Sequence, residues 1–211
     1  MMHPYLSRLG IRAEVQQFFR PFFRVDGIGN LLFAYGEETE HFGFSFHRLP
    51  VTDGFWLAGN SAFSQVRLVI LSASALDAVS WLNKKVAAFP HTENLLFVAL
   101  GAGVSDAQVF WIRQHLARKS FRLLFGRDVL GRMTDLKLAA GIRGWPLSVY
   151  LGEGDKVVVC FRQQHFSFSQ EKFSLAAFEK TAGVRLGVAA DKPKVHNSFF
   201  DELKAEAGLL I

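Results

Sequence analysis

Three short hydrophobic runs, each followed by a segment with helical spacing, dominate the pattern of hydrophobic and polar positions along the chain. They are Leu68–Leu71, Leu95–Leu100 and Phe121–Phe125. Runs without polar alternation are typical of strands that are buried on both faces, as in a parallel sheet covered by helices. The succession of strand and helix predicts three βα units, and therefore an α/β fold in which helices flank a parallel sheet.

The expected helix ends fit this interpretation. Ser74 precedes Asp77 by three residues, and Ser105 precedes Gln108 by three, which is the spacing of a capping box. Gly141 stands where a left-handed glycine would end the third helix. Ligands of open α/β sheets bind at the carboxyl ends of the strands. The segments expected at those ends are Ser72–Asp77, Gly101–Ser105 and Gly126–Gly131.

Residues 1–62 predict a small β-rich N-terminal subdomain of α+β type. A helical segment ends at Pro21, and the segments LLFAY and EHFGFSFHR are expected as strands. In the second segment, Phe42, Phe44 and Phe46 alternate with small or polar residues. This period of two predicts a single strand with one buried and one solvated face.

The rest of the chain is expected to divide into an α/β core and a C-terminal extension, residues 63–151 and 152–211. Pro146–Leu151 is expected to add a strand at the end of the core. The extension begins with a hairpin that contains Lys156–Phe161, and a helix capped by Ser174 follows it. A last helix is expected to start at Asn197 or Ser198.

The central block resembles the Toprim domain of bacterial primases, topoisomerases and related nucleases. In that family one strand ends in glutamate, the next in glycine, and the third in Asp-x-Asp followed by a small residue and glycine. The segments ILSASALDAVS, VALGAG and LLFGRDVLGRMTDLKLAA stand in the corresponding places. Before them, HPYLSRLGI, GNLLFAYGE and HFGFSFHRL are similar to segments that precede the Toprim domain in primase cores. HNSFFDELK resembles the closing segment of Toprim-containing mobilisation and replication proteins.

The resemblance implies a magnesium site, but most of the family's acidic positions are not acidic in this chain. The glutamate position is Ala73, or Ser72 after a slip of one residue. The first aspartate position is Gly126, the second is Asp128, and Gly131 follows. Magnesium requires carboxylate oxygens and water in near-octahedral geometry. We therefore expect no cofactor, and magnesium only if the chain is an enzyme with a rebuilt site.

The three acidic side chains near these positions have simpler expected roles. Asp128 is predicted to cap the third helix, with a residual metal ligand or an ion pair with Arg127 or Arg132 as alternatives. The capping box accounts for Asp77, and Asp135 is expected to pair at the surface.

Positive charge is concentrated between Ser105 and Trp145. This segment has eight basic and three acidic residues, a difference of +5 that equals the net charge of the whole chain. A basic lobe of this kind favours phosphate contacts with DNA or RNA, although a solvated helix surface is the simpler alternative. The residues expected to contact phosphate are Arg122, Arg127, Arg132 and Lys137, with Gly101, Gly103 and Ser105 at the glycine-rich strand end. Arg127 in particular could take the electrostatic place of the metal.

Several other classes of protein are disfavoured. His41 and His47 have no partners at zinc-ligand spacing, and Cys160, the only cysteine, is expected to be buried in a strand. No hydrophobic run is long enough to cross a bilayer and no secretory signal is evident, so we expect a cytoplasmic protein without a membrane partner. Phenylalanine, at 22 of 211 residues, predicts an aromatic core or an exposed aromatic surface for a partner or stacked bases.

Three functions remain open. The first is a catalytically degenerate Toprim-like domain that binds nucleic acid or a replication or mobilisation partner. The second is a primase-like or nuclease-like phosphotransfer enzyme with a rebuilt acidic site. The third is a protein-interaction domain that keeps the fold for packing alone. The missing acids favour the first and third, and the basic lobe favours the first.

Overall fold

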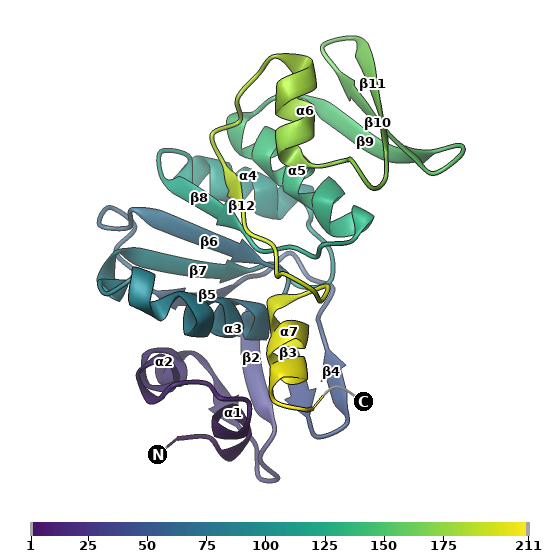
Figure 1. Ribbon diagram of the computed structural model, residues 1–211. Helices are drawn as coiled ribbons and strands as arrows, with labels where there is room; N and C mark the ends of the chain where they lie inside the picture. Colours follow the sequence, from purple (N-terminus) through teal and green to yellow (C-terminus); the bar gives the residue numbers. More distant parts are fainter. Residues whose placement is uncertain (1, 210–211) are drawn as a thin grey trace.

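The computed structural model describes residues 2–209, which form three sheets and seven α-helices in a mixed α/β arrangement (Figure 1). The helices are α1 (Pro4–Arg8), α2 (Ala13–Phe19), α3 (Ala75–Lys85), α4 (Asp106–Leu116), α5 (Val129–Arg143), α6 (Leu175–Ala182) and α7 (Phe199–Glu206). Three short 3-10 turns cover Arg20–Phe22, Val86–Ala88 and Thr92–Asn94.

The central sheet has five strands in the order β12-β8-β6-β7-β5. Their bounds are Ala189–Ala190 for β12, Ser120–Leu123 for β8, Leu68–Ser72 for β6, Leu95–Ala99 for β7 and Trp56–Gly59 for β5. The three predicted strands are confirmed with small shifts of their ends, and they run parallel to one another. The sheet is nevertheless mixed, because β5 pairs with β7 in the antiparallel direction. In β5, buried and half-buried residues alternate, as is typical of an edge strand.

Helices cover both faces of this sheet, as expected. Ile70 and Phe97 point into a core shared with Trp81 of α3 and with the N-terminal helices. The neighbouring residues Val69 and Val98 point into the opposite core, which α4 and α5 close. All five residues of β7 are buried, which explains why that run lacks polar alternation.

The predicted helix starts are confirmed, but one predicted helix end is wrong. The Ser105 and Gln108 side chains form a reciprocal capping box at the start of α4. Helix α5 continues past Gly141 to Arg143 and ends at Gly144, which has a positive φ of 68°. A Cβ atom at Gly141 would lie 2.3 Å from Cγ1 of Val109, so this glycine serves the close packing of α5 against α4.

The N-terminal unit packs α1 and α2 beside a four-stranded antiparallel sheet. Its strands are, in order, β1 (Arg24–Val25), β2 (Leu31–Tyr35), β3 (Glu38–Gly43) and β4 (Phe46–Arg48). The predicted single strand through Phe42, Phe44 and Phe46 is wrong, because the chain reverses after Gly43 to form a hairpin. Phe42 is buried, whereas Phe44 is 94 % and Phe46 45 % exposed.

The C-terminal unit has its own antiparallel sheet, in the order β11-β10-β9, and helix α6. The strands are β9 (Leu147–Gly152), β10 (Lys156–Phe161) and β11 (Gln164–Ser169). The hairpin and the capping of α6 by Ser174 are confirmed. Strand β9 pairs with β10 and not with the central sheet, so an expected boundary at residue 151 falls inside this sheet. Cys160 is half-buried, not buried, because its strand has one exposed face.

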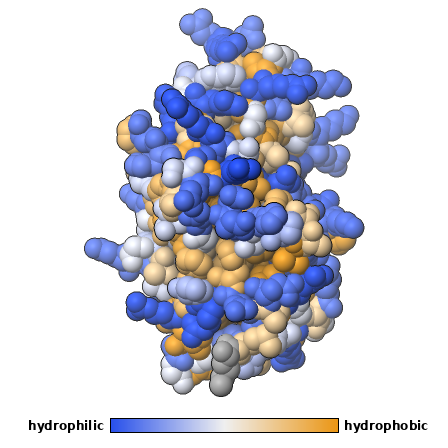
Figure 2. Space-filling model, turned by 90° about the vertical axis from the view of Figure 1, so that its left-hand side faces the viewer, coloured by the Kyte–Doolittle hydropathy of each residue, from blue (hydrophilic) through white to orange (hydrophobic). Residues whose placement is uncertain are grey.

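After α6 the chain returns to the central sheet, adds β12 to its edge, and places α7 against α3. Ser198 caps α7, which confirms one of its two predicted start positions. On the side of the molecule seen in Figure 2, hydrophobic side chains form a band at mid-height, and the C-terminal unit above it is mainly hydrophilic. Among residues 2–209 no helix has the length and hydrophobicity needed to span a membrane.

Candidate functional site at the carboxyl edge of the central sheet

The carboxyl ends of β6, β7 and β8 lie at one edge of the central sheet, where ligands bind in other open α/β folds. The segment that leads from β12 into α7 runs across this edge (Figure 1). Its contacts with the β8 end are backbone and side-chain hydrogen bonds, including one from Arg127 N to Asn197 O of 2.9 Å. The protein therefore covers the expected site with its own C-terminal segment.

At the end of β8, both carboxylate oxygens of Asp128 accept hydrogen bonds from the protein. One carboxylate oxygen accepts from Gly131 N at 2.7 Å, which confirms the predicted N-cap of α5, and the other accepts from Asn197 Nδ2 at 3.2 Å. Asp128 N in turn donates to Asn197 Oδ1. A Cβ atom at Gly126 would lie 2.9 Å from both Asn197 Oδ1 and Asp128 Oδ1. An acidic side chain at the first aspartate position would therefore have to displace the Asn197 amide and the Asp128 carboxylate from this arrangement.

The cation at this strand end is Lys192, not the expected Arg127. Lys192 Nζ donates to Phe125 O at 2.7 Å and Gly126 O at 3.0 Å, and pairs with Asp135 Oδ2 at 2.5 Å. Sequence analysis missed Lys192 because it lies far along the chain from β8, in a segment without regular structure. Only its position in a run of charged residues before the last helix could have suggested a role.

Asp135 was expected at the surface, and this expectation is wrong. The residue is 1 % exposed, because its helical position faces the interior on the side where Lys192 enters. Burial raises the pKa of Asp135 to about 6, and the nearby charges of Lys192 and Arg132 oppose this rise. Burial also lowers the pKa of Lys192, partly offset by Asp135. For both groups, desolvation shifts the pKa more than their mutual attraction does.

At the end of β6, the polar side chains hold the backbone. Ser72 and Ser74 are buried, and Ser72 Oγ donates to Ser74 O at 2.8 Å. The carboxylate of Asp77 accepts from Ser74 Oγ at 2.8 Å and from Phe200 N at 3.0 Å. Asp77 thus satisfies the start of α7 instead of completing a capping box on α3, which corrects its predicted role. Burial raises the pKa of Asp77, and these hydrogen bonds oppose the rise.

Glu40 is a buried acid that sequence analysis missed. It comes from β3 and is 0 % exposed. One carboxylate oxygen accepts from Ala75 N at 2.7 Å and from Tyr35 Oη at 2.6 Å, and the other lies 2.8 Å from His47 Nε2. Burial and the charge of Glu40 raise the pKa of Tyr35. The available signal was the position of Glu40 in the same strand phase as the buried Phe42.

The Glu40 carboxylate therefore lies at the start of α3. Its hydrogen-bond partner there, Ala75 N, comes shortly after Ser72 and Ala73, where the resemblance places a glutamate. All its contacts are to protein groups. It ties the N-terminal sheet to the central unit, since its partners come from β2, β4 and α3.

The glycine-rich end of β7 has a structural explanation. Gly101 has a φ of 84°, and a Cβ atom there would lie 2.4 Å from Pro50 O. Gly101 N donates to Ala73 O, and the Ser105 hydroxyl caps α4. Gly103 is exposed. These three residues shape the loop, and only Gly103 presents its backbone to solvent.

The four predicted phosphate-binding side chains are not gathered in one cluster. Arg122 pairs with Asp191 at 2.5 Å, and Arg132 donates to Glu171 O and Phe173 O at 3.1 Å each. Arg127 is exposed and donates to Lys194 O. Lys137 is exposed and lines a hollow of about 500 Å³ between α4, α5 and β9. Two of the four side chains thus hold the fold together, and two are left at the surface.

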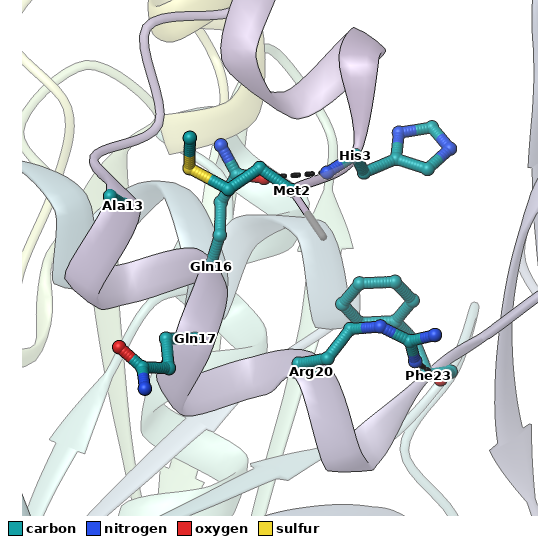
Figure 3. A pocket seen from close by; sticks show the side chains of 7 residues that line it. All are labelled: Met2, His3, Ala13, Gln16, Gln17, Arg20 and Phe23. Carbon is teal, nitrogen blue, oxygen red and sulfur yellow. Dashed lines mark hydrogen bonds between the residues drawn. The ribbon is translucent and has the colours of Figure 1, made fainter.

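The N-terminal unit contains further hollows, one of about 420 Å³ beside α2 (Figure 3). The buried Gln16 amide in its wall accepts from His3 N at 2.9 Å and donates to Ser7 Oγ and Ile11 O. Its hydrogen bonds join α1 to α2. The guanidinium of Arg20 lies over the Phe23 ring, 5.3 Å from its centroid. No acidic side chain is among the described residues that line this hollow.

The residues at the carboxyl edge do not fit magnesium, the metal that the resemblance implies. Gly126 offers no carboxylate, and the oxygens of Asp128 and Asp77 already accept hydrogen bonds from the protein. The Lys192 ammonium lies against the strand-end carbonyls, where it would repel a dication. This edge can anchor a helix and a returning chain segment.

Comparisons with protein-family models, with curated proteins and with solved structures found no match for this chain.

Proposed function

We propose that this chain is a catalytically inactive Toprim-like domain, with a primase-like N-terminal unit, that binds nucleic acid. The three βα units and the antiparallel unit before them support the Toprim-like interpretation, because they stand in the order that the resemblance implies. The absence of catalysis and the binding of nucleic acid rest on different observations.

The observation that carries the proposal is the position of Lys192. Its ammonium group supplies a positive charge at the end of β8, held by two main-chain carbonyls and Asp135. In a metal-dependent phosphotransfer enzyme, a metal at such a position neutralises the phosphodiester and orients the attack. An internal lysine keeps the strand end electrostatically neutral without offering open coordination positions. Under this proposal the chain keeps the Toprim-like fold but does not carry out metal-dependent phosphotransfer.

Nucleic-acid binding rests on the basic residues that the fold leaves at the surface. Arg113 on α4 and Arg118 in the turn that follows α4 are exposed, as are Arg127 just before the start of α5 and Lys137 within α5. In the part of the chain that the structure describes, none of these four makes a salt bridge with a carboxylate. Cations without acidic partners on and beside two packed helices favour contacts with the phosphate backbone.

The test is a double substitution, Arg118→Gln with Lys137→Gln, studied by nucleic-acid binding across a salt series. Each lost phosphate contact should reduce the slope of log affinity against log salt by roughly 0.7 to 0.9. We expect weaker binding to all sequences alike, with an unchanged unfolding temperature. Arg122 and Arg132 are unsuitable here, because their loss would also remove contacts that hold the fold.

The matched control is Lys85→Gln with Lys156→Gln, which removes the same charge from exposed positions on α3 and β10. The control should retain nearly the wild-type slope. Binding by the Arg118→Gln, Lys137→Gln protein that equals wild type would show that α4 and α5 are not the nucleic-acid face. A wild type that does not bind at low salt would contradict the function as a whole.

A further inference from the structure

The outer face of the N-terminal sheet presents a row of side chains that the proposed function does not use. Arg24 pairs with Leu32, Leu32 with His41, and His41 with Arg48, across all four strands. Residues paired in this way project from the same face of a sheet. Neighbouring strands lie about 4.8 Å apart, so the two arginines stand roughly 14 Å from each other at the ends of the row.

This face is the solvated one. The opposite row contains Leu31 and Phe42, which are buried in the core. On the outer face, by contrast, Arg24 and Arg48 are exposed. Among residues 2–209, neither arginine forms a salt bridge with an acidic side chain. Both guanidinium groups are thus available to a ligand.

An exposed aromatic ring lies beside the row. Phe46 is 45 % exposed, and its ring covers Gly43, where a Cβ atom would lie 2.3 Å from Cε1 of Phe46. The edge of this ring meets the His41 ring, with 4.8 Å between centroids and an interplanar angle of 86°. Phe44, at the tip of the hairpin, is 94 % exposed. The ring of Phe46 is therefore fixed in orientation while part of its surface faces solvent.

The surface beside this row is hollowed. A depression of about 520 Å³ is lined by Arg24, Leu32, Ala34 and Thr39 from the sheet, and by Leu57 from β5. The aromatic residues Phe22, Phe23 and Trp56 also line it, and Arg24 is the one charged residue of this lining. Of the acids in this sheet, Glu40 is buried on the opposite face, and Glu37 and Glu38 lie at the turn between β2 and β3. The Asp26 carboxylate lies beside the row, 3.7 Å from His41 Nε2. Asp26 is held by Ile28 N and Asn30 N.

We propose that this outer face, with Arg24, His41, Phe46 and Arg48, is a platform for single-stranded nucleic acid. Aromatic side chains stack on unpaired bases, and arginines contact the phosphates that flank them. A duplex keeps its bases stacked inside the helix, so it cannot use Phe46 in this way. The inference rests on the proposed nucleic-acid function and adds a preference for single strands, on a face separate from α4 and α5.

The experiment compares one fluorescently labelled single strand with its duplex, in anisotropy titrations at low salt. The variant Arg24→Gln, Phe46→Leu, Arg48→Gln keeps the bulk of each side chain but loses the aromatic ring and both charges. Loss of a stacked base and two phosphate contacts should weaken single-strand binding by about tenfold or more. Duplex binding through α4 and α5 should stay near the wild-type value.

Two controls separate this inference from the proposed function. The first is a triple variant that also loses one aromatic ring and two positive charges, but at exposed positions elsewhere: Tyr150→Leu, Lys85→Gln, Lys156→Gln. It should leave single-strand binding unchanged. The Arg118→Gln, Lys137→Gln protein should lose affinity for both single strand and duplex. Circular dichroism should show equal unfolding temperatures for all variants, and Phe46→Leu alone serves if the triple variant is destabilised.

The outcomes are distinct. If the triple variant binds single strands as wild type does, or loses single-strand and duplex affinity equally, the platform is refuted while nucleic-acid binding stands. If wild type binds neither single strand nor duplex, both proposals fail. A loss confined to the single strand supports the platform.

Discussion

Individual acidic residues around the carboxyl edge hold the fold together through hydrogen bonds and ion pairs. Glu40 joins three elements, Asp77 satisfies the start of α7, Asp128 caps α5, and Asp135 neutralises Lys192. Each of these carboxylates has protein groups as hydrogen-bond or ion-pair partners. A residue type that suggests catalysis in the sequence can therefore have a purely structural role once its partners are known.

The buried pair of Asp135 and Lys192 predicts a pH dependence of stability. Because burial raises the pKa of Asp135 to about 6, the folded protein binds this proton more tightly than the unfolded chain does. The resulting stabilisation is complete below the ordinary aspartate pKa and is lost as the pH rises through about 6. We expect the free energy of unfolding to fall by on the order of 2 kcal/mol between pH 4 and pH 7 from this group.

Urea denaturation at a series of pH values measures this effect. Asp135→Asn cannot titrate, so its unfolding free energy should lose this part of the dependence, whereas Asp106→Asn, at an exposed position, should keep it. Parallel pH profiles for Asp135→Asn and wild type would contradict the assignment to this pair.

At the scale of elements, α7 is attached to the central unit by the Asp77 carboxylate and by side-chain packing. Phe199, Phe200 and Leu203 are at most 4 % exposed, and Lys84 of α3 pairs with Glu202 at 2.8 Å. Asp77→Ala leaves Phe200 N without its buried acceptor, which typically costs about 1–3 kcal/mol of stability. We expect that loss in urea denaturation, together with faster amide hydrogen exchange in α7.

Asp77→Asn retains an acceptor oxygen and should cost less than Asp77→Ala. Asp106→Ala, in the exposed first turn of α4, is the control and should change stability by at most about 0.5 kcal/mol. If Asp77→Ala leaves hydrogen exchange in α7 unchanged, the Asp77 carboxylate is not what holds that helix.

The βα units could be predicted from the sequence because their signals are local. Hydrophobic runs such as Leu95–Leu100, and hydroxyl caps such as Ser105, act within a few residues. Gly141 was misassigned because a glycine that permits close helix packing looks the same in sequence as one that ends a helix. The alternation through Phe42 and Phe46 was misleading because a hairpin can keep the period of two while it reverses the chain.

The site could not be predicted, because its contacts join distant positions. Glu40 and Ala75 are 35 positions apart, Lys192 and Gly126 are 66 apart, and Asp77 and Phe200 are 123 apart. No local pattern in any of these segments specifies its partner. Asp135 illustrates the result: as a charged helix residue it was expected at the surface, and only the return of the chain after α6 gives it a buried cation.

At the scale of the whole molecule, the protein has two surfaces with cations that lack acidic partners. It also has a central sheet whose carboxyl edge is covered. Arg118 follows the end of α4 and Lys137 belongs to α5, whereas Arg24 and Arg48 belong to the N-terminal sheet. The carboxyl edge of the central sheet, where an enzyme of this architecture would place its chemistry, is covered by residues 191–200. Both features are what the proposed function, the binding of nucleic acid without its cleavage, requires.

The most direct test is the binding of a labelled oligonucleotide to the wild-type protein across a salt series, with magnesium and with a chelator, followed by analysis of the recovered oligonucleotide. We predict that the affinity falls as the salt concentration rises and that binding does not require magnesium. We also predict that the oligonucleotide is recovered intact. Binding that needs magnesium, or cleavage or extension of the oligonucleotide that Asp128→Asn abolishes, would contradict these predictions and assign the chain to the metal-dependent enzymes.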